Sequence, residues 1–489
     1  MARRVYFLVS VLILSWVFSG ASPPEFEKYF VDRTMRIDYF HGGDAKDAFI
    51  TLDRVYDQGI WAGSLKNLVD PFNLGRYAVK VYDAASGTLI FSRGFDSYFG
   101  EYKTTGPALR GIKRTYHESV LIPYPRNRIV FAVESRDKEN NLRPVFSTEI
   151  DPADITINRE SLTSGVRIFQ ILRSGDPHAK VDIAIVAEGY TAAEEKELLA
   201  DLKRVSEIFF SQEPYRSRPG LFNIYGVFKP SAESGCDEPS HGSFKNTVVG
   251  ASFDSLGSER YVLTEDNRSL RDIAAHVPYD ALVIMVNHSR YGGGGIYNLF
   301  CTFTVDNQWT DYLLLHEFGH SFAGLADEYY TSSVAYNEFY PRGIEPLEPN
   351  ITALLEPENL KWKEVITPGI EIPTPWEKEE FDRMDMAYQK IRQEINERIA
   401  AMKRAAAPRA EVEKAEQDSE KLSRDHAAKV DEFLRGSKFW EKIGAFEGAG
   451  YSAQGLYRPA LDCLMFTKGA KPFCKVCEQA VLRVIQFYT

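Results

Sequence analysis

This 489-residue sequence has little cysteine, no excess of positive charge and no long apolar run after residue 21. Because its formal net charge is −11, nucleic acids and anionic membranes are not expected as partners. No stretch after residue 21 reaches the roughly 18 consecutive apolar residues that predict a membrane span. The length is sufficient for two domains, and we interpret the acidity as a charged, soluble surface.

The cysteines are an odd set of five: Cys236, Cys301, Cys463, Cys474 and Cys477. Outside the cytoplasm, a disulfide from Cys463 to Cys474 or Cys477 would fasten the chain near Cys463 to the last helix. The Cys474–Cys477 pair also fits a redox motif or a second zinc site. A four-cysteine zinc site usually has a second CxxC pair, and its absence here argues against both alternatives.

Residues 1–21 are predicted to form a secretory signal peptide. They contain arginines near the start, an apolar run from Val5 to Phe18 and a small-residue cleavage site before Ser22. No cysteine lies near this site, which argues against a lipid anchor. We therefore expect an exported protein, periplasmic or extracellular, with no membrane span in the mature chain.

The most informative segment is HEFGH at residues 316–320, in a mostly apolar stretch. At about 3.6 residues per turn, His316 and His320 lie on one helix face and are spaced to bind a single Zn²⁺. Glu317 lies beside them, where it can take a proton from a metal-bound water. The alternative is a core helix with two hydrogen-bonded histidines, but chance produces the motif only on the order of 0.01 times in such a chain.

The residues after His320 offer a third ligand. Gly324 can end the helix in a left-handed conformation and turn the chain back toward the metal. The extended metzincin motif has its glycine seven residues and its ligand ten residues after the first histidine, whereas Gly324 and Asp327 each come one residue later. Asp327 and Glu328 are adjacent, so at most one is expected to bind metal while the other turns outward. The spacing favours Asp327, and Glu328 stays open.

The segment HEFGHSFAGLADEYY resembles the zinc segment of the immunoglobulin A peptidase family of bacterial metalloendopeptidases. It is also similar to the HEFGH-xx-GL-x-DEY segment of immune-inhibitor-A-type metallopeptidases. Further segments that resemble the first family are VDIAIVAEGYTAAE (181–194), SAESGCDEPSHG (231–242), GGGGIYN (292–298), and GAFEGAGY with GLYRP (444–459). The resemblance covers most of residues 165–489. It implies one catalytic Zn²⁺ held by His316, His320 and Asp327, and a protein or peptide substrate.

The family name points to immunoglobulin A, but mucins, other host glycoproteins and dietary proteins fit the sequence equally. Two later residues add to this interpretation independently of the resemblance. Met465, in LDCLMF, lies where a metzincin-like domain has its Met-turn, although methionine commonly just fills a core. Tyr457, in GLYRP, is a candidate phenol for polarising the scissile carbonyl, although most of the 26 tyrosines are ordinary packing residues.

Residues 22–160 contain short alternating runs such as 35–40, 77–82 and 129–133, separated by turn signals. This pattern predicts an N-terminal antiparallel β-sandwich domain, in which we find no catalytic constellation.

Residues 165–375 alternate between expected strands (181–186, 221–228 and 281–286) and an expected helix (192–211). The βαβ pattern predicts a mostly parallel sheet. Gly292–Gly295 is expected to be a flexible crossing, and 296–305 an edge strand that could pair with an extended peptide. A mobile glycine loop without substrate contact is the alternative.

Residues 377–436 are rich in Glu, Lys, Arg and Ala, with apolar residues at helical spacing. They predict a hairpin of two long helices broken at Pro408, inserted at the rim of the cleft. Its charges are interpreted as solvated faces.

The sequence thus predicts an α/β (α+β), metzincin-like zinc peptidase domain (165–489) with a helical-hairpin insertion (377–436), preceded by a β-sandwich domain (22–160). Its function would be secreted endopeptidase activity, with Glu317 activating the water. One rival is a glycan- or protein-binding surface protein with structural zinc, although structural zinc needs no general base. Another rival is a zinc amidase that acts on cell-wall peptides.

Overall fold

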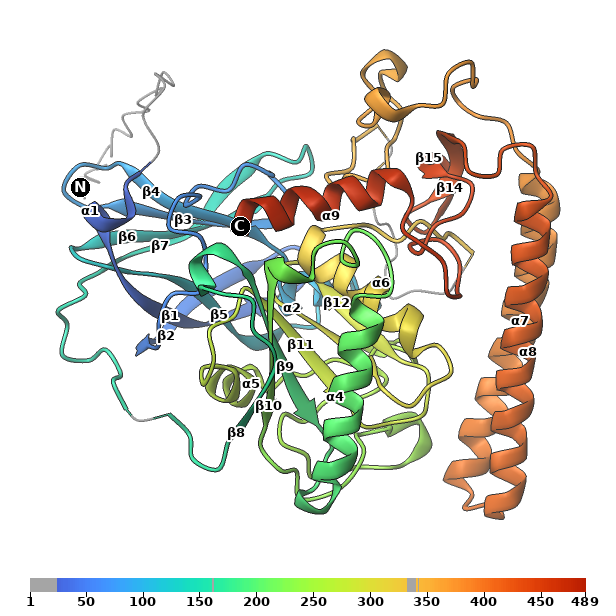
Figure 1. Cartoon of the computed structure of the whole chain (residues 1–489), viewed down its shortest axis with the longest axis horizontal. Coiled ribbons are helices and arrows are strands. Elements are labelled where there is room, and N and C mark those ends of the chain that lie inside the picture. Colours follow the sequence, from blue (N-terminus) through green and yellow to red (C-terminus); the bar gives the residue numbers. More distant parts are fainter. Residues whose placement is uncertain (1–23, 161, 332–339, 342) are drawn as a thin grey trace, which may run out of the picture.

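The computed structural model describes residues 24–160, 162–331, 340–341 and 343–489, and the expected signal peptide lies outside them. The N-terminal region contains two antiparallel sheets with strand orders β2-β1-β5 and β4-β3-β6-β7 (Figure 1). Their strands are β1 (Phe30–Gly43), β2 (Ala48–Gln58), β3 (Tyr77–Asp83), β4 (Leu89–Phe95), β5 (Arg114–Pro125), β6 (Ile129–Arg136) and β7 (Leu142–Ile150). Short helices here are α1 (Phe26–Tyr29), α2 (Tyr98–Tyr102) and α3 (Gly106–Leu109). Both sheets contribute buried apolar side chains to one core.

The central sheet has the strand order β12-β13-β11-β9-β10-β8. Its strands are β8 (Arg167–Leu172), β9 (Val181–Glu188), β10 (Phe222–Phe228), β11 (Ala281–Val286), β12 (Gly293–Ile296) and β13 (Phe300–Thr304). The four inner strands are parallel, and both edge strands are antiparallel. Every residue of β9 and β11 is buried, as expected for strands that are covered on both faces. The expected mixed α/β fold with an N-terminal β-rich region is therefore confirmed.

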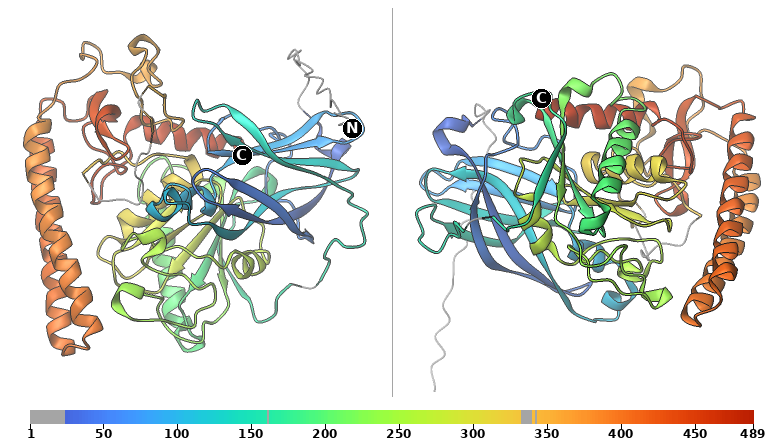
Figure 2. Two further views of the ribbon diagram at one scale, coloured as in Figure 1. Left: turned by 180° about the vertical axis from the view of Figure 1, so that it is seen from behind. Right: turned by 60° about the horizontal axis from the view of Figure 1, so that its bottom comes forward.

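Helices cover both faces of this sheet. Their bounds are α4 (Glu195–Phe209), α5 (Asn267–Ala274), α6 (Thr310–Ala323) and α9 (Lys475–Tyr488). The sheet has a hydrophobic core on each face. The core on one face, called the first core below, contains side chains of α4, α6 and α9 and alternate residues of β9. The second core, on the other face, contains side chains of α5 and the intervening residues of β9. Side chains of α2 and β5 join the second core, so the N-terminal region packs on the α5 side of the sheet (Figure 2).

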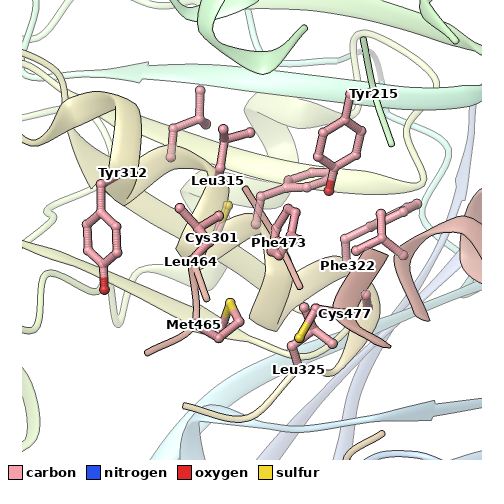
Figure 3. Packing of buried hydrophobic residues seen from close by; sticks show 14 of the residues in the cluster. Tyr215, Cys301, Tyr312, Leu315, Phe322, Leu325, Leu464, Met465, Phe473 and Cys477 are labelled. Atoms are coloured by element: carbon pink, nitrogen blue, oxygen red, sulfur yellow. The ribbon is translucent and has the colours of Figure 1, made fainter. Parts of the chain in front are cut away.

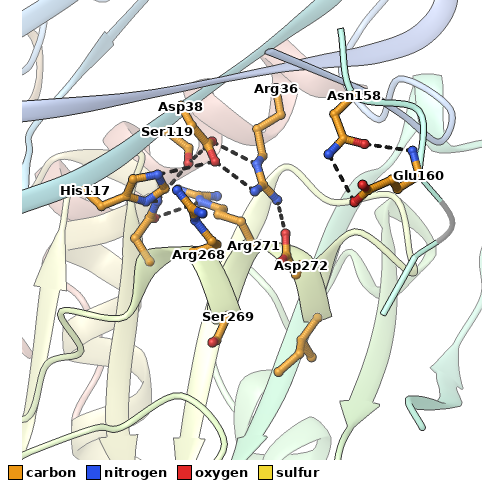
Figure 4. A network of polar contacts seen from close by, with 12 residues as sticks. Arg36, Asp38, His117, Ser119, Asn158, Glu160, Arg268, Ser269, Arg271 and Asp272 are labelled. Atoms are coloured by element: carbon orange, nitrogen blue, oxygen red, sulfur yellow. Dashed lines mark hydrogen bonds and ion pairs between the residues drawn. The ribbon is translucent and has the colours of Figure 1, made fainter. Parts of the chain in front are cut away.

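A buried ion-pair network also fastens the N-terminal sheet to α5 (Figure 4). Arg36, with no exposed surface, donates two hydrogen bonds of 2.8 Å to Asp38 and one of 2.7 Å to Asp272 on α5. Asn267 of α5 donates a 2.8 Å hydrogen bond to Ser119 of β5. Only the Arg36–Asp38 part of this network is fully buried, because the Asp272 side chain is 39% exposed. The bonds to Asp272 and from Asn267 link the two regions.

The prediction that residues 296–305 form an edge strand of this sheet is wrong. The glycines expected to form a flexible crossing instead form β12, which is the edge, and β13 lies inside it. A methyl group on Gly295 would lie 2.4 Å from the Glu317 carbonyl oxygen, so only glycine lets this strand run so close to α6. The glycine run therefore reflects close packing of the backbone rather than mobility.

Two long helices, α7 (Lys378–Arg404) and α8 (Arg409–Arg435), run side by side along one edge of the molecule (Figures 1 and 2). The hairpin of β14 (Ile443–Ala449) and β15 (Ser452–Ala460) follows them. Near the base of the helix pair, Phe381, Val430 and Leu434 belong to the first core. The base of the pair is therefore part of the main body, and its far end contacts that body as well, because Asn396 donates to Glu259 at 2.8 Å and Arg404 donates to the Ser240 carbonyl.

Short 3₁₀ helices complete the described elements: η1 (Pro177–Ala179), η2 (Ala192–Glu194), η3 (Pro219–Leu221), η4 (Pro239–His241), η5 (Ser255–Gly257), η6 (Pro357–Asn359) and η7 (Lys363–Val365). Among the residues that the structure describes, no helix combines the length and apolar character needed to cross a membrane.

Candidate metal centre and active site

Helix α6 carries the HEFGH segment and is buried along most of its length. Leu313, Leu315, Phe318 and Phe322 pack into the first core and fix the orientation of the helix. The helix ends at Gly324, which has φ +60° and whose N–H donates to the His320 carbonyl at 3.0 Å. Left-handed backbone suits glycine, and here it turns the chain back beneath the histidines.

This turn brings three donor atoms together. Nε2 of His316 lies 3.2 Å from Nε2 of His320, and Asp327 Oδ1 lies 3.0 Å and 3.3 Å from these two nitrogens. Asp327 Oδ1 is buried yet makes no hydrogen bond of acceptable geometry. Ligand atoms about 2.0–2.1 Å from a tetrahedral metal ion are about 3.3 Å apart. The spacing and the unsatisfied oxygen both fit a shared metal ion.

The outer nitrogens of both imidazoles are bonded to backbone carbonyls, which can only accept. His316 Nδ1 donates to Leu464 O at 3.1 Å, and His320 Nδ1 donates to Leu325 O at 2.6 Å. Each Nε2 is therefore left with its lone pair pointing into the cluster, the tautomer that a metal ligand needs.

Met465 lies directly under α6. A methyl group on Gly319 of the helix would be only 3.2 Å from the Met465 sulfur. Figure 3 shows Met465 and Leu325 together with Cys477 of α9 in this packed layer. The segment that contains Met465 also supplies the Leu464 carbonyl that holds His316, so it supports the cluster from below.

Glu317 points toward the same cavity as the three donor atoms. Burial raises the pKa of its carboxyl group, an effect that Asp327 reinforces and the two histidines oppose. Burial also disfavours ionisation of Asp327, but the two adjacent imidazoles, His320 above all, favour its charged form and lower its pKa well below the usual range. Asp327 is thus the ionised carboxylate of the cluster.

The cavity above the cluster has a volume of about 90 Å³. His316, Glu317, His320 and Asp327 line it. The rest of its lining includes Arg260, Tyr261, Tyr291, Gly293, Gly295, Tyr312, Tyr329 and Tyr451. A second cavity of about 80 Å³ shares Arg260, Tyr291, Tyr312 and Tyr329 with it and is bounded by α7 and α8. The helix pair therefore borders the space next to the three clustered donor residues.

Tyr451 contacts Asp327 and is one of several cavity residues that the sequence did not reveal. It lies at the turn between β14 and β15, with φ +62°, and its hydroxyl donates to Asp327 Oδ2. Tyr457, six residues further on, is not part of the cavity lining, and its backbone pairs with Thr352 instead. Tyr451 ends the GAFEGAGY segment, which was a usable but unspecific signal.

The sequence predicts that the carboxylate that does not reach the histidines turns outward. Glu328 is that carboxylate, and it turns inward instead. It is fully buried and faces Cys463, Cys474 and Cys477, with Oε1 accepting from Cys477 Sγ at 3.1 Å. The expected disulfide is also wrong, because all five cysteines are described and all are free. Cys463 and Cys477 have sulfur atoms 3.8 Å apart, well beyond a disulfide bond of about 2.05 Å.

Comparison with known proteins gives a family for almost the whole chain. The model of the IgA Peptidase M64 family matches residues 169–485, and the model of the Peptidase M64 N-terminus matches residues 25–147. No curated protein matches the chain. Members of a peptidase family act on proteins or peptides, and the clustered His316, His320 and Asp327 lie within the matched region. The chain therefore belongs to the IgA peptidase M64 family and is a peptidase.

Proposed function

We propose that this protein is a zinc-dependent endopeptidase with His316, His320 and Asp327 as the metal ligands. The observation that carries the proposal is the meeting of two imidazole nitrogens and one carboxylate oxygen within 3.3 Å, beside Glu317. Two nitrogen ligands and one oxygen ligand are typical of hydrolytic zinc, and three protein ligands leave a position for water. Met465 beneath the helix supports a metzincin-like arrangement.

Bound zinc would polarise the scissile carbonyl and lower the pKa of the attacking water. Glu317 accepts the proton of that water and then donates it to the leaving amine. Tyr451, hydrogen-bonded to Asp327, is the phenol that we assign to stabilise charge on the carbonyl oxygen. The sequence suggests Tyr457 for that role, but Tyr457 does not line the cavity, which favours Tyr451.

The substrate is a polypeptide in extended conformation. The edge strand β12 borders the cavity through Gly293 and Gly295, next to Glu317. The backbone of Gly293 is already bonded to Arg260 and Val262, so an added strand would pair with the edge beyond that bridge, from Gly295 onward. We further propose export of the mature chain on the basis of residues 1–21. We also propose the division into a β-sandwich domain (22–160) and a peptidase domain (165–489) with the helix pair as an insertion (377–436).

The test is the Glu317→Gln variant. It should keep its full zinc content, because Glu317 is not a ligand, and lose about 10²-fold or more of its turnover of an unfolded protein. Metal analysis and mass-spectrometric mapping of the cleaved bonds measure the two effects. The wild-type enzyme should cut internal peptide bonds of unfolded proteins. A zinc-loaded Glu317→Gln variant that still cleaves at the wild-type rate would refute the mechanism.

The same assay separates the rival functions. A binding protein with structural zinc would cut no substrate at all, and an amidase specific for cell-wall peptides would leave unfolded proteins intact. Removal of zinc by a chelator, followed by recovery of activity on addition of Zn²⁺, should show that the peptidase activity depends on the metal.

A further inference from the structure

Four potential metal ligands outside the proposed catalytic centre lie together beneath it. They are Glu328, Cys463, Cys474 and Cys477, each fully or almost fully buried, and one donor atom from each lies within 4.8 Å of the others. Three distant segments contribute: the residue next to Asp327, the chain just before Met465, and the start of α9. The peptidase mechanism uses none of these four groups.

The sulfur positions agree with metal binding rather than a disulfide. Cys463 Sγ and Cys477 Sγ are 3.8 Å apart. Two thiolates at about 2.3 Å from one tetrahedral zinc ion are about 3.8 Å apart, whereas disulfide sulfurs are about 2.05 Å apart. With three cysteines in the cluster, one thiol would also remain unpaired after any disulfide had formed.

The carboxylate gives an independent indication. Glu328 has no exposed surface, and its Oε2 atom has no hydrogen-bond partner. Its other oxygen, Oε1, accepts from Asn350 Nδ2 at 3.0 Å and from Cys477 Sγ at 3.1 Å. A buried carboxylate oxygen without a partner is costly, and a metal ion would satisfy it directly.

Backbone groups near the sulfur atoms favour negative charge. The Cys474 backbone N–H donates to Cys463 Sγ at 3.2 Å, and Cys474 is the N-cap residue of α9 while Cys477 lies in its first turn, where the helix dipole favours negative charge. The CxxC spacing is also the usual spacing of a zinc-binding pair.

We propose that Cys463, Cys474, Cys477 and Glu328 bind a second Zn²⁺ ion. Sulfur-rich tetrahedral sites select zinc over calcium or magnesium, and four protein ligands in a buried position make a closed, structural site. This ion joins the segment of Asp327, the segment of Met465 and the start of α9. It therefore positions the first metal centre without taking part in the reaction, and its presence does not depend on peptidase activity.

The test uses the full-length protein and Zn²⁺ alone. Wild-type protein should contain two zinc ions per chain, and the double variant His316→Ala/His320→Ala should retain one. X-ray absorption spectra of the retained zinc should show sulfur neighbours at about 2.3 Å. No zinc in a folded double variant, or retained zinc with only nitrogen and oxygen neighbours, would overturn the proposal.

A second measurement does not depend on a variant that folds. Wild-type protein unfolded without reductant should release two zinc ions and expose free thiols at all 5 cysteines. A disulfide between Cys463 and Cys477, detected by mass spectrometry, would contradict the proposal. The variant Cys236→Ser is the matched control, because this buried cysteine lies outside the cluster and its loss should leave both ions bound.

These outcomes are separate from those of the proposed peptidase function. A wild-type protein with a single zinc in a sulfur-rich environment would support this site and count against the histidine site. A single zinc bound only by nitrogen and oxygen would do the reverse.

Discussion

The substitution Gly295→Ala tests the packing of β12 against the helix that bears the metal ligands. The added methyl group would lie 2.4 Å from the Glu317 carbonyl oxygen and 2.8 Å from His320 Cβ. Ordinary contacts begin near 3.4 Å, so the strand and the helix would have to separate by about 1 Å. Both obstacles are parts of α6 that cannot rotate away, because one is backbone and the other is a Cβ atom.

The expected effect has two components. Overpacking a well-packed site costs about 1–3 kcal/mol of unfolding free energy. A displacement of about 1 Å at the catalytic groups costs about 10²-fold in rate. We therefore expect kcat/KM for a peptide substrate to fall by about 10²-fold in the fraction that remains folded, with a modest decrease of the urea midpoint.

The neighbouring substitution Gly294→Ala is the matched control. Its methyl group would meet the end of the Leu263 side chain at 2.7 Å, with no α6 atom among its nearest neighbours. Because that side chain can move, Gly294→Ala should cost some stability and leave kcat/KM of the folded enzyme nearly unchanged. Equal kcat/KM values for wild type and Gly295→Ala would refute the idea that glycine at 295 maintains the site.

Three further predictions concern the ligands, the phenol and the helix pair. Asp327→Ala should remove one zinc ion per chain and abolish peptidase activity, and a variant with unchanged zinc content would exclude Asp327 as a ligand. Tyr451→Phe should lower kcat by about 10²-fold while Tyr457→Phe stays near wild type, and the reverse order would restore Tyr457 as the phenol. Replacing residues 393–422 with a short Gly-Ser linker should keep zinc and cooperative unfolding, because the residues of the pair that belong to the first core are retained and surface contacts such as those of Asn396 and Arg404 with the main body are lost. Cleavage of folded proteins should then change more than cleavage of short peptides, and loss of cooperative unfolding would show that the removed part belongs to the core.

Several features were predictable because they depend on neighbours along the chain. The i,i+4 spacing of His316 and His320 requires only helix geometry, and the left-handed turn at Gly324 follows from the freedom of glycine. Apolar runs such as 281–286 were expected as strands, and β11 has these bounds. Family-like segments then extended the sequence reasoning to most of the chain.

The glycines at 292–295 show where such reasoning fails. A run of glycine is compatible with a mobile loop and with a strand that packs closely against a helix, and composition does not distinguish them. Only the position of α6 beside β12 decides between these alternatives. For the same reason, the spacing favoured Asp327 as the carboxylate near the histidines but could not exclude Glu328. The choice depends on which side chain the folded backbone directs toward the histidines.

The sequence by itself determined how the two histidines, Glu317 and the turn that follows them lie relative to one another, because helix and turn geometry are local properties. Tertiary structure alone decided the remaining partners. The carbonyl that orients His316 lies 148 residues away, Tyr451 lies 124 residues from Asp327, and the cysteine cluster joins three separate segments. Contacts over such separations depend on how buried surfaces of different elements pack against one another, which no spacing along the chain encodes.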